Sequence, residues 1–382
     1  MNFDLTEEQR MARDAVREFA RAEIAPLAHE YDIEEKFPSR QLNGLAELGL
    51  LGMIIPEEYG GAGFDTVSYA LCLEEIAKAD PSVCVIVSVT NSVCCFPILQ
   101  FGTEAQKQKY LIPLAKGEKL GAFCLSEPQA GSDATNLKTR AVSDGDFYVL
   151  NGTKSWVSNG AFADTFIVMA VTGELEAGKK EITSFLVEKG TPGFTVSSVE
   201  HKMGQRASQT NEMSLADVRV HKENVLGGTG NGMKVAFGSL DNGRIGVAAL
   251  SVGIAQAALD ESLKYSKDRV AFGKPIAEHQ AIQMKLANMS TETEAARLLT
   301  LQAAAAKDAK LKNAGSLASM AKLFASENAN KVAAEAVQIH GGNGYSRHYK
   351  VEKLYRDARI TTIYEGTSEM QRIVISRGIL RD

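Results

Sequence analysis

A carboxylate near the C-terminus stands where it could act as a base. Glu365 is followed by Gly366, and helices seldom continue through glycine. Ser368 and Gln371 have the spacing of a capping box, which predicts that a new helix starts there. Glu365 would then lie in a short connection, free to point into a cavity beside backbone N–H groups that favour an anion. The alternative for this segment alone is an ordinary solvated glutamate in a loop.

Four ordered motifs resemble one protein family. The run YEGT at 364–367 resembles the catalytic-base segment of acyl-CoA dehydrogenases. The runs AFCLSEPQAGSD at 122–133, RVAFG at 269–273 and QIHGG at 338–342 resemble three further signatures of that family. The match extends from about residue 3 to the last residues. The resemblance implies an α+β fold: an N-terminal α-helical domain, a middle β-barrel domain and a C-terminal four-helix bundle.

The resemblance also implies FAD as cofactor, shared between neighbouring subunits. No Gly-x-Gly-x-x-Gly run follows a predicted strand, so a Rossmann site is not supported. An esterase is a poor alternative for the 340–342 run, because no Gly-x-Ser-x-Gly elbow accompanies it. The FAD contacts that the resemblance implies are Phe123, Leu125, Ser126, Gly131, Ser132, Trp156, Val157, Ser158, Arg269, Phe272, Gln280, Gln338, Ile339, Gly341, Gly342, Thr367, Ser368 and Glu369.

Several of these residues also have a simpler interpretation. Gly341 could be a helix C-cap, Trp156 a core residue and Arg269 a solvated side chain on a helix face. Under the resemblance, Arg269 contacts the FAD pyrophosphate, since a planar guanidinium can bond two oxygens at once. Val157 is a mild departure from the family pattern at that position, while Ser158 keeps a hydroxyl that could bond flavin N5.

The run DNGR at 241–244 matches the family segment that grips the pantetheine arm and thioester of acyl-CoA. The substrate contacts that the resemblance implies are Ser132, Asp241, Arg244, Tyr364 and Gly366. A helix N-cap with an i, i+3 salt bridge is the simpler interpretation of Asp241 and Arg244. In another branch of the family the base immediately precedes this arginine. Here Gly243 has no side chain and Glu365 is present, which is the short- and medium-chain arrangement.

The activity implied is α,β-dehydrogenation of an acyl-CoA thioester to the 2-enoyl-CoA. Glu365 would be the general base, and the hydride would go to flavin N5. The Glu365 N–H and a ribityl hydroxyl would stabilise the developing enolate oxygen. Burial should raise the pKa of Glu365 more than the nearby helix N-terminus lowers it. Polar Thr90 and Asn91, near the expected acyl pocket, favour a short, branched or cyclic acyl group.

The expected partners are acyl-CoA, an electron-transferring flavoprotein as electron acceptor, and further copies of the chain in a homotetramer, a dimer of dimers. Two alternatives within the fold are an acyl-CoA oxidase and a flavin monooxygenase. An alternative of another class is a non-catalytic subunit that binds acyl-CoA and FAD, which loss of the base would mark. Glu365 and the Asp241–Arg244 pair favour thioester chemistry over monooxygenation, and the presence of Glu365 argues against the non-catalytic subunit, while the oxidase stays open.

Composition narrows the class of protein. The 382 residues suffice for two or three domains, and a net charge of −5 argues against a nucleic-acid partner. Five cysteines without a Cys-x-x-Cys motif indicate buried thiols in a reducing compartment. Six scattered histidines predict no metal site. No signal peptide and no membrane span are expected, which favours a bacterial cytoplasmic protein, or a mitochondrial matrix protein if a transit peptide has been removed.

Sequence patterns predict three zones that would position these residues: 1–119 helical, 120–228 β and 229–382 helical. In the first zone, Thr6 and Gln9 form a capping box, Pro26 should kink or end the first helix, and helices follow near 39–49, 67–78 and 81–99. In the second, strands near 147–150, 165–168 and 182–187 with turns at 144–145 and 151–152 predict a small antiparallel sheet or barrel. The third should contain four or more long helices.

Overall fold

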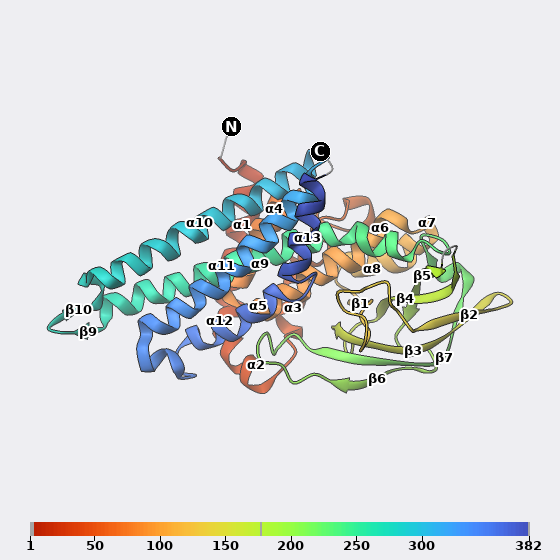
Figure 1. Ribbon diagram of the computed structural model, residues 1–382, viewed down its shortest axis with the longest axis horizontal. Coiled ribbons are helices and arrows are strands. Elements are labelled where there is room, and N and C mark those ends of the chain that lie inside the picture. Colours follow the sequence, from red (N-terminus) through yellow and green to blue (C-terminus); the bar gives the residue numbers. More distant parts are fainter. Residues whose placement is uncertain (1–3, 176–177, 381–382) are drawn as a thin grey trace.

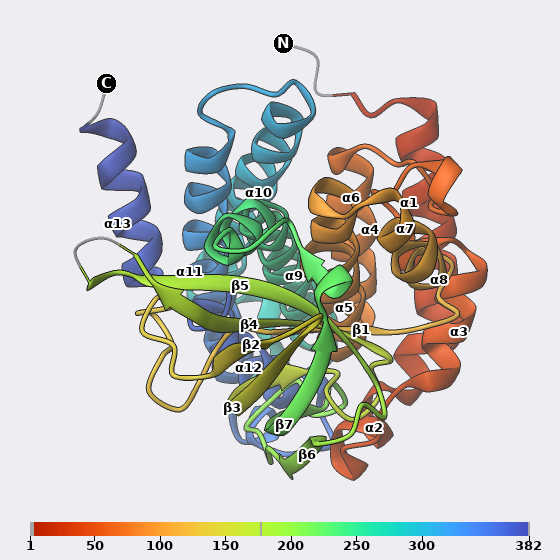
Figure 2. The same ribbon diagram turned by 90° about the vertical axis from the view of Figure 1, so that its right-hand side faces the viewer.

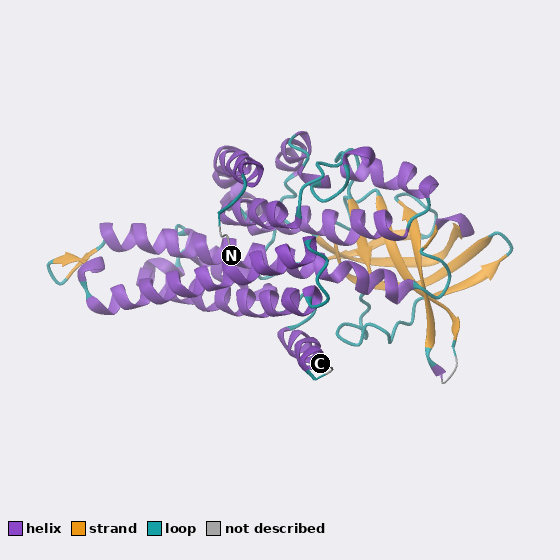
Figure 3. Cartoon of the chain, turned by 90° about the horizontal axis from the view of Figure 1, so that it is seen from above, coloured by secondary structure: helices purple, strands orange, loops and turns teal. Residues whose placement is uncertain are grey.

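The computed structural model describes residues 4–175 and 178–380. The chain folds as helices, then a sheet, then a bundle of long helices, the order expected from the sequence. Figure 1 shows the sheet at one end of an elongated molecule and the tip of the long bundle helices at the other. Figure 3, the view from above, shows the same separation of strands and bundle tip.

The N-terminal helices begin and end where local signals place them. Helix α1 starts with the predicted capping box: the Thr6 side chain accepts from the Gln9 N–H, and the Gln9 side chain accepts from the Thr6 N–H. Pro26 lies in a 3₁₀ turn that interrupts the helical path, as predicted. The helices of this region are α1 Glu7–Phe19, α2 Ala28–Glu34, α3 Ser39–Glu47, α4 Thr66–Ala79, α5 Pro81–Val89, α6 Phe96–Phe101, α7 Glu104–Gln106 and α8 Ile112–Ala115.

The central helical segment of this region is apolar throughout. Helices α5 and α6 are joined by the π-helical turn Thr90–Cys95, so the helical path runs from Pro81 to Phe101. By length and composition this segment is apolar enough to cross a membrane, although no membrane span was expected from the sequence. However, 89% of its apolar window is buried inside the protein, and a buried core helix passes the same test. All five cysteines are free and buried, as expected.

The β region forms one eight-stranded sheet, whose twist Figure 2 shows. Its strands are β1 Gly121–Cys124, β2 Arg140–Asp144, β3 Phe147–Ser158, β4 Thr165–Glu174, β5 Lys180–Glu188, β6 Phe194–Val199, β7 Thr210–His221 and β8 Val225–Leu226. The order along the sheet is β6-β7-β3-β2-β4-β5-β8, with β1 paired to β4. Most pairs are antiparallel, as predicted, but β4 pairs in parallel with both β1 and β2.

The two predicted turns of this region have different outcomes. A tight turn at Gly145, with φ 61°, joins β2 to β3 as predicted. The predicted turn at 151–152 is wrong, because both residues lie inside β3. Gly152 instead marks a bulge in the pairing with β7, where a Cβ would come within 2.4 Å of the Thr139 hydroxyl. Glycine is needed there for close packing rather than for a chain reversal.

The described part of the C-terminal region contains three long antiparallel helices and two shorter ones, rather than the four or more long helices expected. They are α9 Gly232–Asp268, α10 Gln280–Asp308, α11 Ala314–His340, α12 Lys350–Arg359 and α13 Ser368–Ile379. A small hairpin, β9 Val270–Ala271 with β10 Lys274–Pro275, joins α9 to α10 at the far tip. The N-terminal end of α9 packs on the sheet, since a Cβ at Gly232 would lie 2.8 Å from the Ile182 carbonyl oxygen. Helix α9 therefore spans the molecule from the sheet to the tip.

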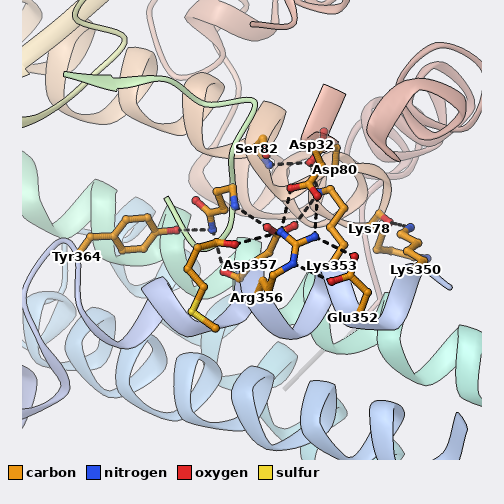
Figure 4. Close-up of polar contacts among 12 residues, drawn as sticks. Asp32, Lys78, Asp80, Ser82, Lys350, Glu352, Lys353, Arg356, Asp357 and Tyr364 are labelled. Carbon is orange, nitrogen blue, oxygen red and sulfur yellow. Dashed lines mark hydrogen bonds and ion pairs between the residues drawn. The ribbon is translucent and has the colours of Figure 1, made fainter. Parts of the chain in front are cut away.

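A buried cluster of charged residues joins α12 to the rest of the fold (Figure 4). Lys353 donates to Asp80 at 2.9 Å and to Asp357 at 2.6 Å, and all three side chains are at most 4% exposed. Next to them, Arg356 pairs with Asp32 of α2 at 2.6 Å. The Asp80 carboxylate also caps α5 by accepting from the Ser82 N–H. The cluster thus ties α12 to α2 and to the start of α5.

Replacement of Lys353 by Met should lower the free energy of unfolding by about 3–5 kcal/mol, because two carboxylates would remain buried without their cation. Urea unfolding of the purified protein measures this change. Lys331→Met is the matched control: Lys331 pairs with Glu292 but its side chain is 58% exposed, so no measurable loss is expected. Equal effects of the two substitutions would contradict the importance of the cluster.

Candidate active site

Glu365 lies in the turn before α13, as the sequence predicts. Both Glu365, at φ 52°, and Gly366, at φ 92°, have left-handed backbone conformations. Helix α13 starts at Ser368 as predicted, but the predicted Ser368–Gln371 capping box is wrong. Thr367 is the N-cap and accepts from the Met370 N–H, because it has the extended backbone that a cap requires. The Gln371 amide instead donates to the carbonyls of Glu365 and Gly366.

The Glu365 carboxylate is enclosed and incompletely bonded. Its Oε2 atom is buried and has no hydrogen-bond partner among the described residues. It faces Gly243 of α9, where a Cβ would lie only 1.7 Å from Oε2. Burial raises the pKa of Glu365 to about 7, against the lowering effects of Lys322 and Arg244. A carboxyl group with this pKa can both take and release a proton near neutral pH.

Polar groups of α9 lie on either side of Gly243. Arg244 donates to Asp241 at 2.9 Å, the i, i+3 salt bridge foreseen as the simpler interpretation of this pair. The Arg244 Nε and the Asn242 Nδ2 atoms are buried without a hydrogen-bond partner among the described residues. Buried donors are normally satisfied, so these two unpaired groups indicate a site that a polar ligand would complete.

Lys322 is a member of this site that the sequence interpretation missed. It lies on α11, is fully buried, and its Nζ donates to the Gly366 carbonyl at 2.8 Å. Burial lowers its pKa to about 8. The available signal was a single lysine in the run LASMAKLFAS at 317–326, since lysine is rarely buried without a partner.

A polar pair lies one helical turn beyond Gly243. A Cβ at Gly246 would come within 2.3 Å of the Ser88 hydroxyl and 2.8 Å of the Tyr69 hydroxyl, which bond each other at 3.1 Å.

Thr90 and Asn91 do not support the expectation, made from their polarity, of a short, branched or cyclic acyl group. Thr90 donates to the Ile86 carbonyl, and the Asn91 amide donates to the backbone carbonyls of Leu50 and Val87. The donors of both residues are therefore used inside the fold.

One group of predicted FAD contacts comes together in the β region. The loop 125–132 and strand β3 are joined by a hydrogen bond from the Ser155 N–H to the Ser126 carbonyl at 2.9 Å. Trp156 is 62% exposed, so it is not the core residue of the simpler interpretation. The Val157 side chain is 1% exposed and packs in the sheet core, so only its backbone could contact a ligand. The remaining members of this group are Phe123, Leu125, Gly131, Ser132 and Ser158.

A buried ion pair holds that loop against β3. Lys154 donates to Glu127 Oε1 at 2.7 Å, and Glu127 also accepts from the backbone N–H groups of Lys138 and Thr139. Burial alone would raise the pKa of Glu127, but Lys154 and these donors hold it at about 2. The carboxylate thus stays charged and fixes both ends of the loop that carries Gly131 and Ser132.

A second group lies at the opposite end of the molecule. Arg269 and Phe272 lie at the β9–β10 hairpin, and Phe272 is 96% exposed. The stretch 338–342 reaches the same end, since Asn343 donates to the Tyr265 hydroxyl near the C-terminal end of α9. With a helical rise of ~1.5 Å per residue, Arg269 lies about 40 Å beyond Gly243 along α9. This group comprises Arg269, Phe272, Gln280, Gln338, Ile339, Gly341 and Gly342, and Ile339 has a buried side chain.

The third set, Thr367, Ser368 and Glu369, lies at the start of α13 beside the Glu365 turn.

The three sets of predicted FAD contacts fit one FAD molecule if two copies of the chain contribute. A Cβ at Gly131, Gly341 or Gly342 would meet nothing within 4 Å, so the backbone there is open to close approach by a ligand. Gly341 is also the C-cap of α11, with φ 59°, so the simpler interpretation holds beside the functional one. The β-region group and the tip group of predicted FAD contacts lie toward opposite ends of one chain.

Comparison with known proteins shows the family of the chain. The sequence matches the N-terminal, middle and C-terminal domain families of acyl-CoA dehydrogenase over residues 6–118, 122–218 and 230–380. It is 50% identical over 381 residues to a probable acyl-CoA dehydrogenase of Bacillus subtilis, with 100% of both chains covered.

Two solved structures resemble the chain over its whole length. Butyryl-CoA dehydrogenase from Megasphaera elsdenii has a TM-score of 0.96 and 46% identity, with full coverage of both chains. A chain in a structure described as the electron transferring flavoprotein of Acidaminococcus fermentans gives the same TM-score, identity and coverage.

The fold and the site together define a flavin-dependent oxidoreductase built from helices, a sheet and a helix bundle. The chain belongs to the acyl-CoA dehydrogenase family, whose enzymes use FAD to oxidise CH–CH bonds of acyl-CoA thioesters.

Replacement of Gly243 by Ala should displace the Glu365 carboxylate, because the new methyl group would occupy the position of Oε2. We expect the rate of anaerobic flavin reduction by acyl-CoA to fall ~10²-fold, with FAD content unchanged. Gly238→Ala on the same helix is the control, since its Cβ would approach no atom closer than a Phe101 ring carbon at 3.1 Å. Unchanged reduction in the Gly243 variant would show that the carboxylate is not needed in this position.

Proposed function

We propose that this chain dehydrogenates a short-chain acyl-CoA between its α and β carbons, with Glu365 as the general base. The observation that carries the proposal is the buried Glu365 carboxylate, unpaired at Oε2, opposite the empty side-chain position of Gly243. Its pKa of about 7 suits removal of a weakly acidic α-proton near neutral pH. Intact Glu365 and the Asp241–Arg244 pair favour this reaction over monooxygenation and over a non-catalytic binding subunit.

Residues around the base would prepare the thioester. The Glu365 N–H donates to no group among the described residues, so it is free to bind the thioester oxygen as enolate character develops. Arg244 and Asp241 would bind the pantetheine side of the ligand, together with Ser132, Tyr364 and Gly366. FAD, when bound, supplies the acceptor for the β-hydrogen as hydride.

A short acyl group suits the polar packing beside the base. The Tyr69–Ser88 pair occupies the face of α9 one turn beyond Gly243, and a long aliphatic chain would have to pass buried hydroxyls there. The similarity to a butyryl-CoA dehydrogenase supports the same size class. The Tyr69–Ser88 hydroxyls, rather than Thr90 and Asn91, support this size limit, and straight, branched and cyclic short acyl groups are all compatible with it.

Shared cofactor binding supports an oligomer. We assign the β-region contacts and the α13 start of one protomer, and the tip residues of its neighbour, to the same FAD, in a homotetramer built as a dimer of dimers. The domains would be 1–119, 120–228 and 229–382. An electron-transferring flavoprotein is proposed as the electron acceptor, in line with the structure described as that flavoprotein. The proposed location is the bacterial cytoplasm, or the mitochondrial matrix for a processed precursor.

Glu365→Gln should retain FAD and acyl-CoA binding but lower the rate of flavin reduction by at least ~10²–10⁴, because the amide cannot accept the α-proton. In the unaltered enzyme this rate should rise with pH through about 7, since the raised pKa keeps Glu365 protonated below that point. Stopped-flow reduction under anaerobic conditions, measured with butyryl-CoA across a pH series, tests both statements. Rapid reduction in the Gln variant would place the base elsewhere.

Arg269→Ala should weaken FAD retention and the assembly together, because the pyrophosphate would lose a bidentate partner supplied by a neighbouring subunit. Flavin absorbance and sedimentation velocity of the same preparation measure both. Lys274→Ala, in the same exposed hairpin, is the control, and should change neither quantity. Full FAD content with an unchanged oligomer in the Arg269 variant would refute the assignment.

A further inference from the structure

Lys322 is buried in an unusual way for a lysine. The two other lysines whose side chains are at most 4% exposed, Lys154 and Lys353, each contact a carboxylate directly. Lys322 is fully buried, yet no ion pair to a carboxylate within 4.0 Å is found for it in the described part of the chain. Its hydrogen bond goes to a backbone carbonyl, that of Gly366. Burying a cation without a contacting anion costs free energy, so the buried position of Lys322 indicates that the residue has a function.

The bond from Lys322 fixes the peptide that follows the base. The Gly366 carbonyl accepts from Lys322 Nζ at 2.8 Å and from the Gln371 amide at 3.0 Å. Glu365 is held at φ 52°, a conformation that side-chain-bearing residues seldom adopt. Two donors on one carbonyl, from α11 and α13, therefore hold a turn that would otherwise relax.

The charge of Lys322 also acts on the carboxylate. Two cations influence Glu365, Lys322 from α11 and Arg244 from α9. The Arg244 charge is offset by its contact with Asp241 at 2.9 Å, whereas Lys322 has no such contact. Glu327 on α11 and Glu369 on α13 act on Lys322 more weakly than Glu365 does. Lys322 is thus the main source of net positive charge facing the base.

We propose that Lys322 is a positioning residue for the base: its ammonium group holds the Glu365–Gly366 turn in place and favours the charged form of the Glu365 carboxylate. The inference rests on the proposed role of Glu365 and adds a second residue that acts through it. The ammonium group transfers no proton to the substrate. It sets where the carboxylate sits and at which pH it becomes a base.

Three substitutions separate the two effects. Lys322→Gln keeps a donor for the Gly366 carbonyl but removes the charge, Lys322→Met removes both, and Lys322→Arg keeps both. The readouts are the anaerobic flavin-reduction rate with butyryl-CoA from pH 5.5 to 9, FAD content and melting temperature of the holoenzyme. Lys331→Gln, on the exposed face of the same helix, is the control and should leave the pH profile unchanged.

We expect the Gln variant to shift the midpoint of the acid limb upward by about one pH unit or more, because a nearby positive charge no longer favours the carboxylate. The Met variant should show the same shift and a plateau rate lower by roughly 10–100-fold, since the turn is also released. The Arg variant should restore the midpoint at least in part. A purely structural lysine would lower the melting temperature without moving the midpoint.

An unshifted midpoint in a Gln variant that retains FAD would overturn the inference. If the Met variant fails to fold, the Gln and Arg variants still decide the question, because both retain a donor to the turn. Failure of the positioning role of Lys322 can be distinguished from failure of the proposed function. Loss of activity in Glu365→Gln with unshifted Lys322 variants would refute only the positioning role, whereas activity in Glu365→Gln would refute the base itself.

Discussion

The space beside Gly243 is the constraint on which the site depends. Helix α9 and the turn before α13 approach so closely that a Cβ on one would overlap a carboxylate oxygen on the other. Each segment accepts a local penalty for this arrangement: glycine inside a helix costs about 1 kcal/mol relative to alanine, and a left-handed glutamate costs about 1–3 kcal/mol. Neither would persist unless the surrounding packing held both segments in place, so the position of the base is a property of the whole bundle.

Buried polar groups hold the turn around Glu365 in place from two sides. On one side, the Gln205 amide, from the loop between β6 and β7, donates to the Asp357 carbonyl and to the Tyr364 hydroxyl. On the other, Lys322 and Gln371 bind the carbonyl of Gly366. The residues immediately before and after Glu365 are therefore each tied to a different part of the fold. This makes the buried charges near α12 relevant to the site as well as to stability.

Local signals in the sequence were sufficient for helix ends and for the position of Glu365. The Thr6 capping box depends on neighbouring residues only and was confirmed, and α13 starts at Ser368 as predicted, although its cap is Thr367 rather than Ser368. Gly152 was misassigned because an Asn-Gly pair has the same sequence at a turn and at a bulge, and only the approach of Thr139 distinguishes them. Lys322 was missed because its partner is a backbone carbonyl 44 residues away, which no sequence spacing reveals. Contacts of this kind appear only once the helices are placed.

The predicted FAD contacts lie far apart in one chain, so FAD binding, subunit assembly and stability would depend on one another. Gly131 and Trp156 lie at the sheet end, and Arg269 lies at the tip of the bundle about 40 Å beyond Gly243. If one FAD is held by the sheet end of one protomer and the tip of another, its binding energy adds to the subunit interface. The apparent stability then depends on both FAD and protein concentration, because a ligand that binds only the assembled state stabilises it by mass action. In that arrangement a single protomer would contain the base but only part of the flavin site, so catalytic competence would arise with assembly.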